Sequence, residues 1–175
     1  THDAFCPDDF LTRAEAAELL ARLVADQRPA SGRSPYPDVN EQDWYFDSVA
    51  SLSEKGILNG YEDGSFRPDA QITRAEFAAV LAQFVDEGNA LPAAEYRDVT
   101  ARDWFYAPVM HLANSGFLTG YDDQTMRPDA PITRAEAVTV LNRMLGRTYA
   151  DTMQHPFTDI AGHWAYEAIV AASND

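Results

Sequence analysis

The chain repeats itself with a period of about sixty residues, and this period constrains the fold more than any other feature. The tetrapeptide Thr-Arg-Ala-Glu occurs three times, with its arginines at Arg13, Arg74 and Arg134, at intervals of 61 and 60 residues. Tryptophans recur at intervals of 60 residues, at Trp44, Trp104 and Trp164. A unit of this length holds little more than one pair of helices, which cannot bury its apolar faces alone. Neighbouring units must therefore share a core.

The sequence starts and stops inside a repeat. Residues 1–35 match the second half of a unit, residues 36–95 and 96–155 are two complete units, and residues 156–175 match the first half of a unit. The two ends therefore add up to almost one further unit. We expect the C-terminal half-repeat to pack beside the N-terminal half-repeat and complete it, which would give a pseudo-threefold bundle.

An amphipathic helix is predicted after each Thr-Arg-Ala-Glu. In the second copy the apolar residues fall at the spacing i, i+3, i+4, i+7 and i+8, which is one face of a helix: Phe77, Val80, Leu81, Phe84 and Val85. Thr-x-x-Glu is the capping-box pattern, in which threonine and glutamate each bond a backbone N–H of the other. Each copy of the tetrapeptide should therefore begin a helix.

A second helix is expected to begin near each tryptophan. In the first full unit, Asp43 is placed to cap this helix and Gly56 to end it. Pro108 is compatible with such a helix only in its first turn, where its missing N–H costs little. The loops between the helices are dense in Gly, Asp and Pro, and little strand is expected. The fold class is therefore all-α, with six main helices.

The arginine at the first position of each predicted helix is not explained by helix stability. A cation at a helix N-terminus opposes the macrodipole, at a cost of a few tenths of a kcal/mol. An anion from outside would reverse this, because the first-turn N–H groups and a guanidinium together suit a carboxylate or phosphate. The alternative is intramolecular pairing with an aspartate such as Asp38 or Asp98.

Composition and motifs exclude several classes of function. With 46% hydrophobic residues the chain is globular, and a net charge of −15 disfavours nucleic acid and anionic membranes as partners. Cys6 is the only cysteine, and the four histidines show no metal-ligand spacing. No apolar run is long enough to span a bilayer. Neither a catalytic motif nor a calcium-loop pattern is present, so we expect no enzyme, no cofactor and no metal.

The segment "GYEDGSFRPDAQITRAEFAAVLAQF" and its neighbours resemble the S-layer homology domain over nearly the whole chain. The resemblance implies three tandem domains in a three-pronged, all-helical spindle. It also implies an extracellular module that holds proteins non-covalently on a secondary cell-wall polysaccharide, often one carrying pyruvate ketals. Arg13, Arg74 and Arg134 carry over as ligand-binding residues in grooves between neighbouring prongs. Further candidates are Asp38, Asp98, Asp159 and the three tryptophans.

Several roles stay open at this point. The tryptophans either fill the core, which is favoured, or stack on sugar rings. Tyr61 and Tyr121 follow glycines and either line a groove or only shape a turn. The three aspartates either brace loops or contact ligand. The module either anchors to the wall, or it mediates protein–protein assembly of a surface layer through the same grooves. Replacing Arg74 and Arg134 with alanine is expected to abolish wall binding and to leave the melting temperature nearly unchanged.

Overall fold

The computed structural model describes residues 3–24, 29, 32–86 and 95–174, which form two compact units. The smaller unit is Leu11–Ile72, and the larger unit comprises Thr1–Phe10 and Thr73–Asp175. Residues 27–39 and 86–99 connect one repeat to the next, and parts of both segments lie outside the described residues.

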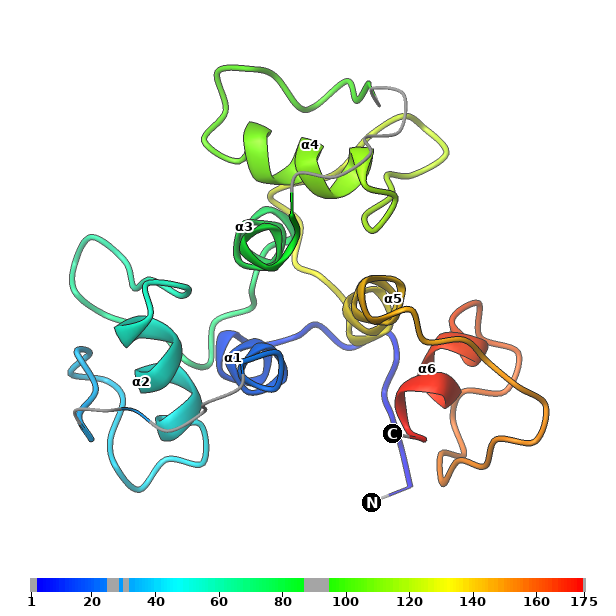
Figure 1. Ribbon diagram of the computed structural model, residues 1–175, viewed down its shortest axis with the longest axis horizontal. Coiled ribbons are helices and arrows are strands. Elements are labelled where there is room, and N and C mark those ends of the chain that lie inside the picture. The colour runs from blue at the N-terminus through cyan, green and yellow to red at the C-terminus, as the bar shows by residue number, and fades with distance from the viewer. Residues whose placement is uncertain (1–2, 25–28, 30–31, 87–94, 175) are drawn as a thin grey trace. The chain divides into compact units, whose positions relative to one another are not determined.

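The smaller unit contains two helices, α1 (Arg13–Ala21) and α2 (Phe46–Glu54), which pack against each other. In Figure 1, α1 is seen nearly end-on while α2 lies across it in the plane of the picture. The loop that follows α2 returns to the start of α1, where the N–H of Ile72 donates to the carbonyl of Leu11 at 3.0 Å.

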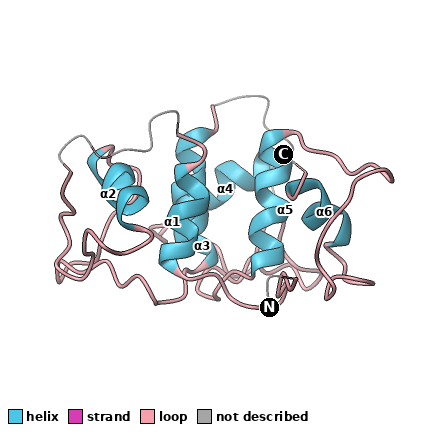
Figure 2. Ribbon diagram, turned by 90° about the horizontal axis from the view of Figure 1, so that it is seen from below, coloured by secondary structure: helices cyan, strands magenta, loops and turns pink. Residues whose placement is uncertain are grey.

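The larger unit repeats this pairing twice. Helix α4 (Tyr106–Asn114) packs on α3 (Arg74–Leu81), and α6 (Tyr166–Ala172) packs on α5 (Arg134–Leu145). The 3₁₀ turn η1 (Ala82–Phe84) extends α3. The described residues thus hold six α-helices and no strand, which confirms the all-α class (Figure 2). In both units a tryptophan helix covers the Thr-Arg-Ala-Glu helix that precedes it in the chain.

The predicted capping boxes are present at all three Thr-Arg-Ala-Glu helices, with both bonds of the box formed. At α5, for example, the N–H of Glu136 donates to Oγ1 of Thr133 at 3.2 Å, and the N–H of Thr133 donates to Oε2 of Glu136 at 2.9 Å. The pattern Thr-x-x-Glu was therefore a reliable helix-start signal here, because both partners lie within one turn.

The tryptophan helices begin differently from the prediction. Asp43 does not cap α2: its Oδ2 accepts from the N–H of Asn40 at 2.7 Å, and the N-cap residue is Tyr45, with no side-chain cap. Asp43 instead closes the turn before the helix. Gly56 does follow the end of α2 in the left-handed conformation, at φ +68°. Pro108 lies in the first turn of α4, as expected.

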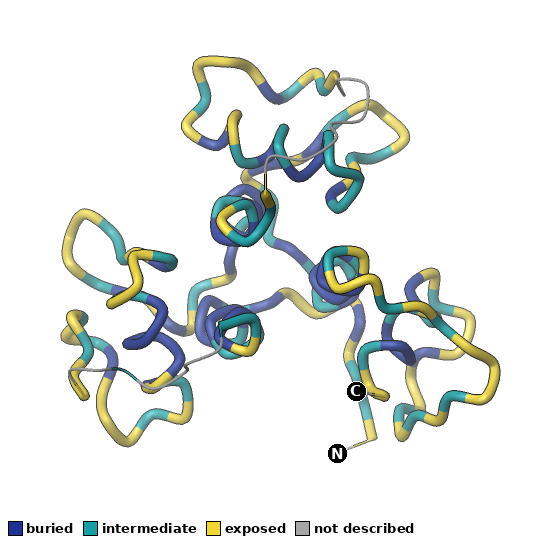
Figure 3. The backbone as a smooth tube through the Cα atoms, in the orientation of Figure 1, coloured by how far each residue is buried: buried dark blue, intermediate teal, exposed yellow. Residues whose placement is uncertain are grey.

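The buried residues gather along the paired helices, and the long loops carry most of the exposed ones (Figure 3). Fully buried side chains include Leu20 and Leu52 in the smaller unit and Phe77, Leu112 and Ile169 in the larger. The prediction that the tryptophans pack in the core is wrong. Trp44, Trp104 and Trp164 are 63%, 65% and 64% exposed, because each lies two residues before the start of its helix rather than on the buried face of the helix.

The two chain ends meet within the larger unit. The N–H groups of Phe5 and Cys6 donate to the carboxylate of Asp159 at 2.8 and 2.7 Å, and the N–H of Thr158 donates to the carbonyl of Asp3 at 2.8 Å. Phe5 also packs edge-to-face on Phe157. The C-terminal half-repeat therefore joins the N-terminal segment through residues 3–6, whereas its helix α6 packs on α5.

A candidate ligand-binding recess

The N-terminal amides of the Thr-Arg-Ala-Glu helices are already occupied. The N–H groups of Arg74 and Ala75 donate to the carbonyls of Ala130 and Pro128, both at 2.9 Å. The starts of α1 and α5 make the corresponding bonds, α1 to Ala70 and Pro68 and α5 to Asp9 and Pro7. The expectation that these amides would help to bind an anion is therefore wrong, because a loop that begins with Pro-Asp in another repeat uses them: residues 68–70 at α1, 128–130 at α3 and 7–9 at α5.

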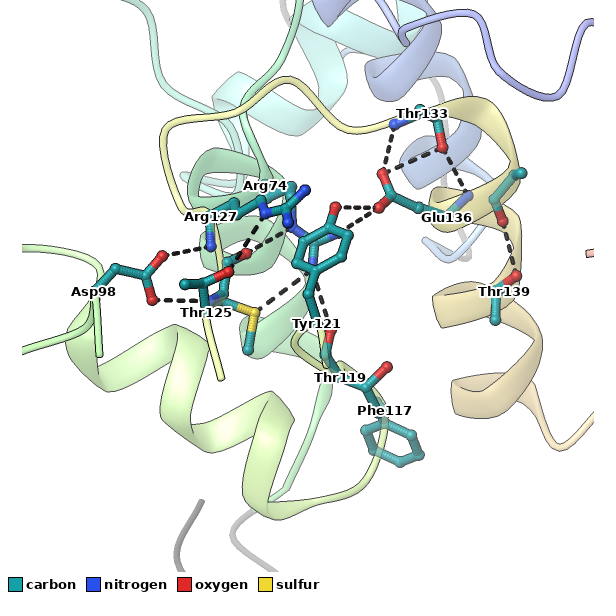
Figure 4. Close-up of polar contacts among 12 residues, drawn as sticks. Arg74, Asp98, Phe117, Thr119, Tyr121, Thr125, Arg127, Thr133, Glu136 and Thr139 are labelled. Carbon is teal, nitrogen blue, oxygen red and sulfur yellow. Dashed lines mark hydrogen bonds and ion pairs between the residues drawn. The ribbon is translucent and has the colours of Figure 1, made fainter. Parts of the chain in front are cut away.

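The side chain of Arg74 is buried, with 3% of its surface exposed. Its Nε donates to the carbonyl of Met126 at 2.8 Å, and its Nη2 donates to the carbonyl of Thr119 at 3.1 Å. Its Nη1 meets Oε1 of Glu136 at 3.0 Å in an ion pair (Figure 4). The intramolecular partner of this guanidinium is thus the capping glutamate of the next copy, not the aspartate considered from the sequence.

Tyr121 lies between two guanidinium groups. The carbon Cζ of Arg74 is 4.9 Å and that of Arg127 is 3.9 Å from the ring centroid, which are cation–π distances. The Tyr121 hydroxyl donates to Oε1 of Glu136 at 2.5 Å (Figure 4). Burial and this bond to a carboxylate raise the pKa of Tyr121 above its ordinary value. The ring therefore stays neutral and donates to Glu136 at physiological pH.

These residues form one wall of a recess in the larger unit, which encloses roughly 190 Å³. It is lined by the start of α3, residues 118–121 of the loop before α5, one face of α5 and Trp164, which precedes α6. The lining residues are Arg74, Leu118, Thr119, Gly120, Tyr121, Glu136, Thr139, Val140, Arg143 and Trp164. The recess thus combines an exposed aromatic ring, three hydroxyl-bearing side chains, two guanidinium groups and one carboxylate.

Arg13 and Arg134 are held in the same manner as Arg74. Nε of Arg13 donates to the carbonyl of Phe66 at 2.8 Å, and its guanidinium lies 4.6 Å from the ring centroid of Tyr61. Nε of Arg134 donates to the carbonyl of Phe5 at 2.8 Å. Each motif arginine therefore fixes the backbone of a neighbouring loop.

Tyr61 serves the turn and also faces cations. Its N–H donates to the carbonyl of Ser65 at 2.8 Å, which closes the loop, and its ring is 4.1 Å from the guanidinium carbon of Arg67. The turn role considered from the sequence is therefore present at Tyr61, and the groove-lining role stays a prediction.

The three aspartates hold loop backbone. Asp38 accepts from the N–H groups of Phe66 and Arg67, and Asp98 accepts from those of Met126 and Arg127. Asp159 makes the equivalent bonds to Phe5 and Cys6. Partial burial acts to raise the pKa of Asp38, but the two amides outweigh it and the pKa lies below its ordinary value. The amides of Phe5 and Cys6 likewise lower the pKa of Asp159.

The amide pairs account for an unusual backbone. Cys6, Arg67 and Arg127 all have positive φ, at 55°, 57° and 51°, a conformation that costs energy for residues other than glycine. An aspartate that accepts from both flanking amides stabilises this kink. The bracing role weighed for these aspartates therefore has a direct structural basis.

The sequence did not indicate several residues of the recess. Glu136 was expected only as a helix cap, and no role at the site was expected for Leu118, Thr119, Thr139, Val140 or Arg143. A weak signal for Arg143 exists, because the aligned positions of the other copies hold Arg22 and Gln83, which are also long polar side chains. The contact between Arg74 and Glu136 joins residues 62 positions apart, which no local pattern reveals.

Two classes of site are not found in the part of the chain that the structure describes. No group of three or more His, Cys, Asp or Glu side chains is arranged to hold a metal ion. No described helix combines the length and the apolar character that crossing a membrane requires.

Comparison with known proteins points to surface proteins of bacteria. The chain is 33% identical to a cellulosome-anchoring protein of Acetivibrio thermocellus, over 94% of this chain and 39% of that protein. It is 31% identical to cell surface glycoprotein 1 of the same organism, over 98% of this chain and 8% of that protein. A surface-layer 125 kDa protein of Lysinibacillus sphaericus is 28% identical over 81% of this chain and 12% of its own length.

The chain thus spans well under half of each of these relatives. The S-layer homology domain matches residues 35–78 and 95–138, and these two segments together make up half of the chain. Both segments run from the loop before a tryptophan helix to the first turn of the next Thr-Arg-Ala-Glu helix, so the chain belongs to the S-layer homology domain family.

Proposed function

We propose that this chain is a non-catalytic anchoring module of the bacterial cell surface that binds an anionic secondary cell-wall polysaccharide, one bearing pyruvate ketals. Membership of the S-layer homology domain family supports anchoring at the cell surface, as do relatives named for cellulosome anchoring and for surface layers. The polysaccharide and its acidic group are the further content of the proposal.

The recess beside Arg74 is the observation that carries the proposal. A sugar ring has one face of C–H groups that packs well on an aromatic ring, and Trp164 presents a ring that is 64% exposed at this recess. The hydroxyls of Thr119 and Thr139 are suited to sugar hydroxyls. A large exposed aromatic side chain beside polar and cationic groups is better explained by binding than by folding.

The motif arginines enter the proposal as residues that shape the sites. Arg74 forms part of the recess wall, holds the loop before α5 through the carbonyls of Thr119 and Met126, and pairs with the Glu136 carboxylate of α5. Arg13 and Arg134 are proposed to serve corresponding sites, with Asp38, Asp98 and Asp159 bracing the loops. We further propose that the repeats, with the two half-repeats joined, form the three-pronged bundle of the family.

Sedimentation with purified cell-wall sacculi tests the function. The protein should sediment with intact sacculi and remain in the supernatant when the secondary polysaccharide has been extracted. Trp164→Ala should weaken binding, and its melting temperature should stay within a few degrees of the wild type because the ring is exposed. Equal binding to extracted sacculi would reject the polysaccharide as partner, and binding only to a second copy of the protein would favour the assembly role.

A further inference from the structure

We propose that Arg143, and not the motif arginine Arg74, supplies the positive charge by which the recess selects a carboxylate-bearing sugar. The proposal rests on the proposed function, since it names the side chain that binds the carboxylate of the sugar in the same recess. It assigns a specificity-determining role to a residue outside the Thr-Arg-Ala-Glu motif.

The charge of Arg74 is compensated inside the protein. Its side chain is 3% exposed, and Nε, Nη1 and Nη2 each donate to a protein acceptor, one of them the carboxylate of Glu136 at 3.0 Å. An incoming carboxylate would have to compete with Glu136 for this guanidinium and would meet the negative charge of Glu136 nearby. Arg74 and Glu136 therefore form a neutral pair that contributes little to anion attraction.

Arg143 is the remaining cation of the recess lining. The charged residues among its lining are Arg74, Glu136 and Arg143, so the neutral pair leaves a net charge of about +1 on the recess. The whole chain carries −15. The net charge of the chain opposes the approach of an anion, so the local charge of Arg143 is needed to favour an anionic ligand in the recess, and this preference is lost if Arg143 loses its charge.

The guanidinium of Arg143 is also free to reorient toward a ligand. The side chain is exposed, and its Nη1 makes only long bonds, 3.3 Å to the carbonyl of Phe117 and 3.4 Å to Oγ1 of Thr119. Both acceptors are neutral, so neither compensates the charge. A guanidinium in this state can form the paired, charge-assisted bonds that a planar carboxylate favours.

The positions of the other groups specify the rest of the ligand. Thr139 donates its hydroxyl hydrogen to the carbonyl of Ala135 at 2.8 Å, so its oxygen is left to accept from a sugar hydroxyl. Trp164 offers a ring face on the same recess. The ligand class is therefore a pyranose with one carboxylate, and two sources carry this chemistry: a pyruvate ketal and a uronic acid.

Titration calorimetry with three methyl glycosides separates these sources. The full chain is titrated with a pyruvate-ketal hexoside, with a hexuronoside and with the neutral hexoside. Arg143→Gln removes only the charge and leaves a side chain of the type found at the aligned Gln83. Arg102→Gln, at an exposed position outside the recess lining, is the control with the same change in net charge.

The wild type should bind at least one acidic glycoside more tightly than the neutral one. Arg143→Gln should weaken that binding between about 10-fold and 100-fold, the range expected for a charge-assisted bond, and should change binding of the neutral glycoside less than about 2-fold. Arg143→Lys should lose part of the affinity, and Arg102→Gln should behave as the wild type. Unchanged melting temperatures exclude a folding defect.

Two outcomes overturn the inference. In the first, Arg143→Gln retains the preference for the acidic glycoside. In the second, the wild type shows no such preference. If sacculi are still bound in either case, the anchoring function stands and only the role of Arg143 falls. If the wild type fails to sediment with intact sacculi, the proposed function itself is rejected.

Discussion

At the scale of single residues, the arginine and the glutamate of Thr-Arg-Ala-Glu act on different copies of the repeat. Glu136 caps its own helix through Oε2 and pairs through Oε1 with Arg74, the arginine of the preceding copy. The cation at the helix start, which disfavours an isolated helix, is therefore offset by an acid and by loop carbonyls. From the sequence, the capping role was derivable, but the pairing partner was not.

Replacing Arg74 with alanine should destabilise the protein, contrary to the small effect expected from the sequence. The variant leaves the half-buried carboxylate of Glu136 without its cation and frees two loop carbonyls, which should cost about 3 kcal/mol. Urea unfolding followed by circular dichroism measures this free energy. Arg127→Ala is the control, because its pair with Asp123 is exposed to solvent and should contribute little to stability. An unchanged midpoint for Arg74→Ala would show that the buried pair is not stabilising.

The free energy of unfolding should fall in acid, because Asp38 and Asp159 accept their backbone hydrogen bonds as carboxylates. The pKa values of Asp38 and Asp159 are lowered in the folded protein, so the unfolded chain takes up protons first as the pH falls. Their contribution is complete above the ordinary aspartate pKa of about 4 and declines below it. The melting temperature of Asp38→Asn/Asp159→Asn should therefore lie below that of the wild type at pH 7, and the gap should narrow below about pH 4. A gap that is independent of pH would exclude the charge as its cause.

At the scale of elements, the loop between the paired helices positions the recess. Gly120 lets the ring of Tyr96 and the backbone of Thr125 lie close to the loop. A Cβ at this position would lie 2.4 Å from Cε1 of Tyr96 and 2.6 Å from the carbonyl oxygen of Thr125. The same crowding occurs at Gly60 against Tyr36. The loop composition predicted a turn, but only the structure shows that a tyrosine from the preceding connector makes glycine necessary.

Gly120→Ala should destabilise the loop and weaken ligand binding together. The added methyl group forces Tyr96 or the Thr125 backbone to move, at a cost of about 1–3 kcal/mol. Thermal unfolding gives the stability change, and sacculus sedimentation gives the change in binding. Gly162→Ala serves as a comparison, since its Cβ would meet no atom within 4 Å and its cost would come from its positive φ of 77° alone. A Gly120→Ala variant as stable as the wild type would contradict the crowding.

At the scale of the whole molecule, residues from opposite ends of the chain build one core. Ile160, Ile169 and Val170 are buried with Ala135 of α5, and Phe5 packs on this cluster from the N-terminal segment. Asp159 accepts from the N–H groups of Phe5 and Cys6, which lie near the other end of the chain. Asp98 makes the equivalent two bonds within a single repeat. Residues some 150 positions apart in sequence therefore depend on each other for stability.

Phe5→Ala should loosen α6 selectively. The ring is partly buried against the cluster, so its loss should cost about 2 kcal/mol, less than for a fully buried phenylalanine. Hydrogen exchange should show protection of residues 166–172 reduced roughly tenfold or more, with α2 unaffected. Phe10→Ala, at a position 45% exposed in the same segment, is the matched control. Equal loss of protection in α2 and α6 would point to global unfolding instead.

The sequence by itself determined the repeat, the all-α class, the three capping boxes and the glycine at the end of α2, because each depends on residues within a few positions of one another or on a fixed period. Only the tertiary structure decided that the tryptophans are exposed, that the helix-start amides are occupied by a loop of another repeat, and that Arg74 pairs with Glu136 and leaves Arg143 at the recess. Those outcomes depend on which distant segments share space, and the burial and charge of a side chain are set by these neighbours.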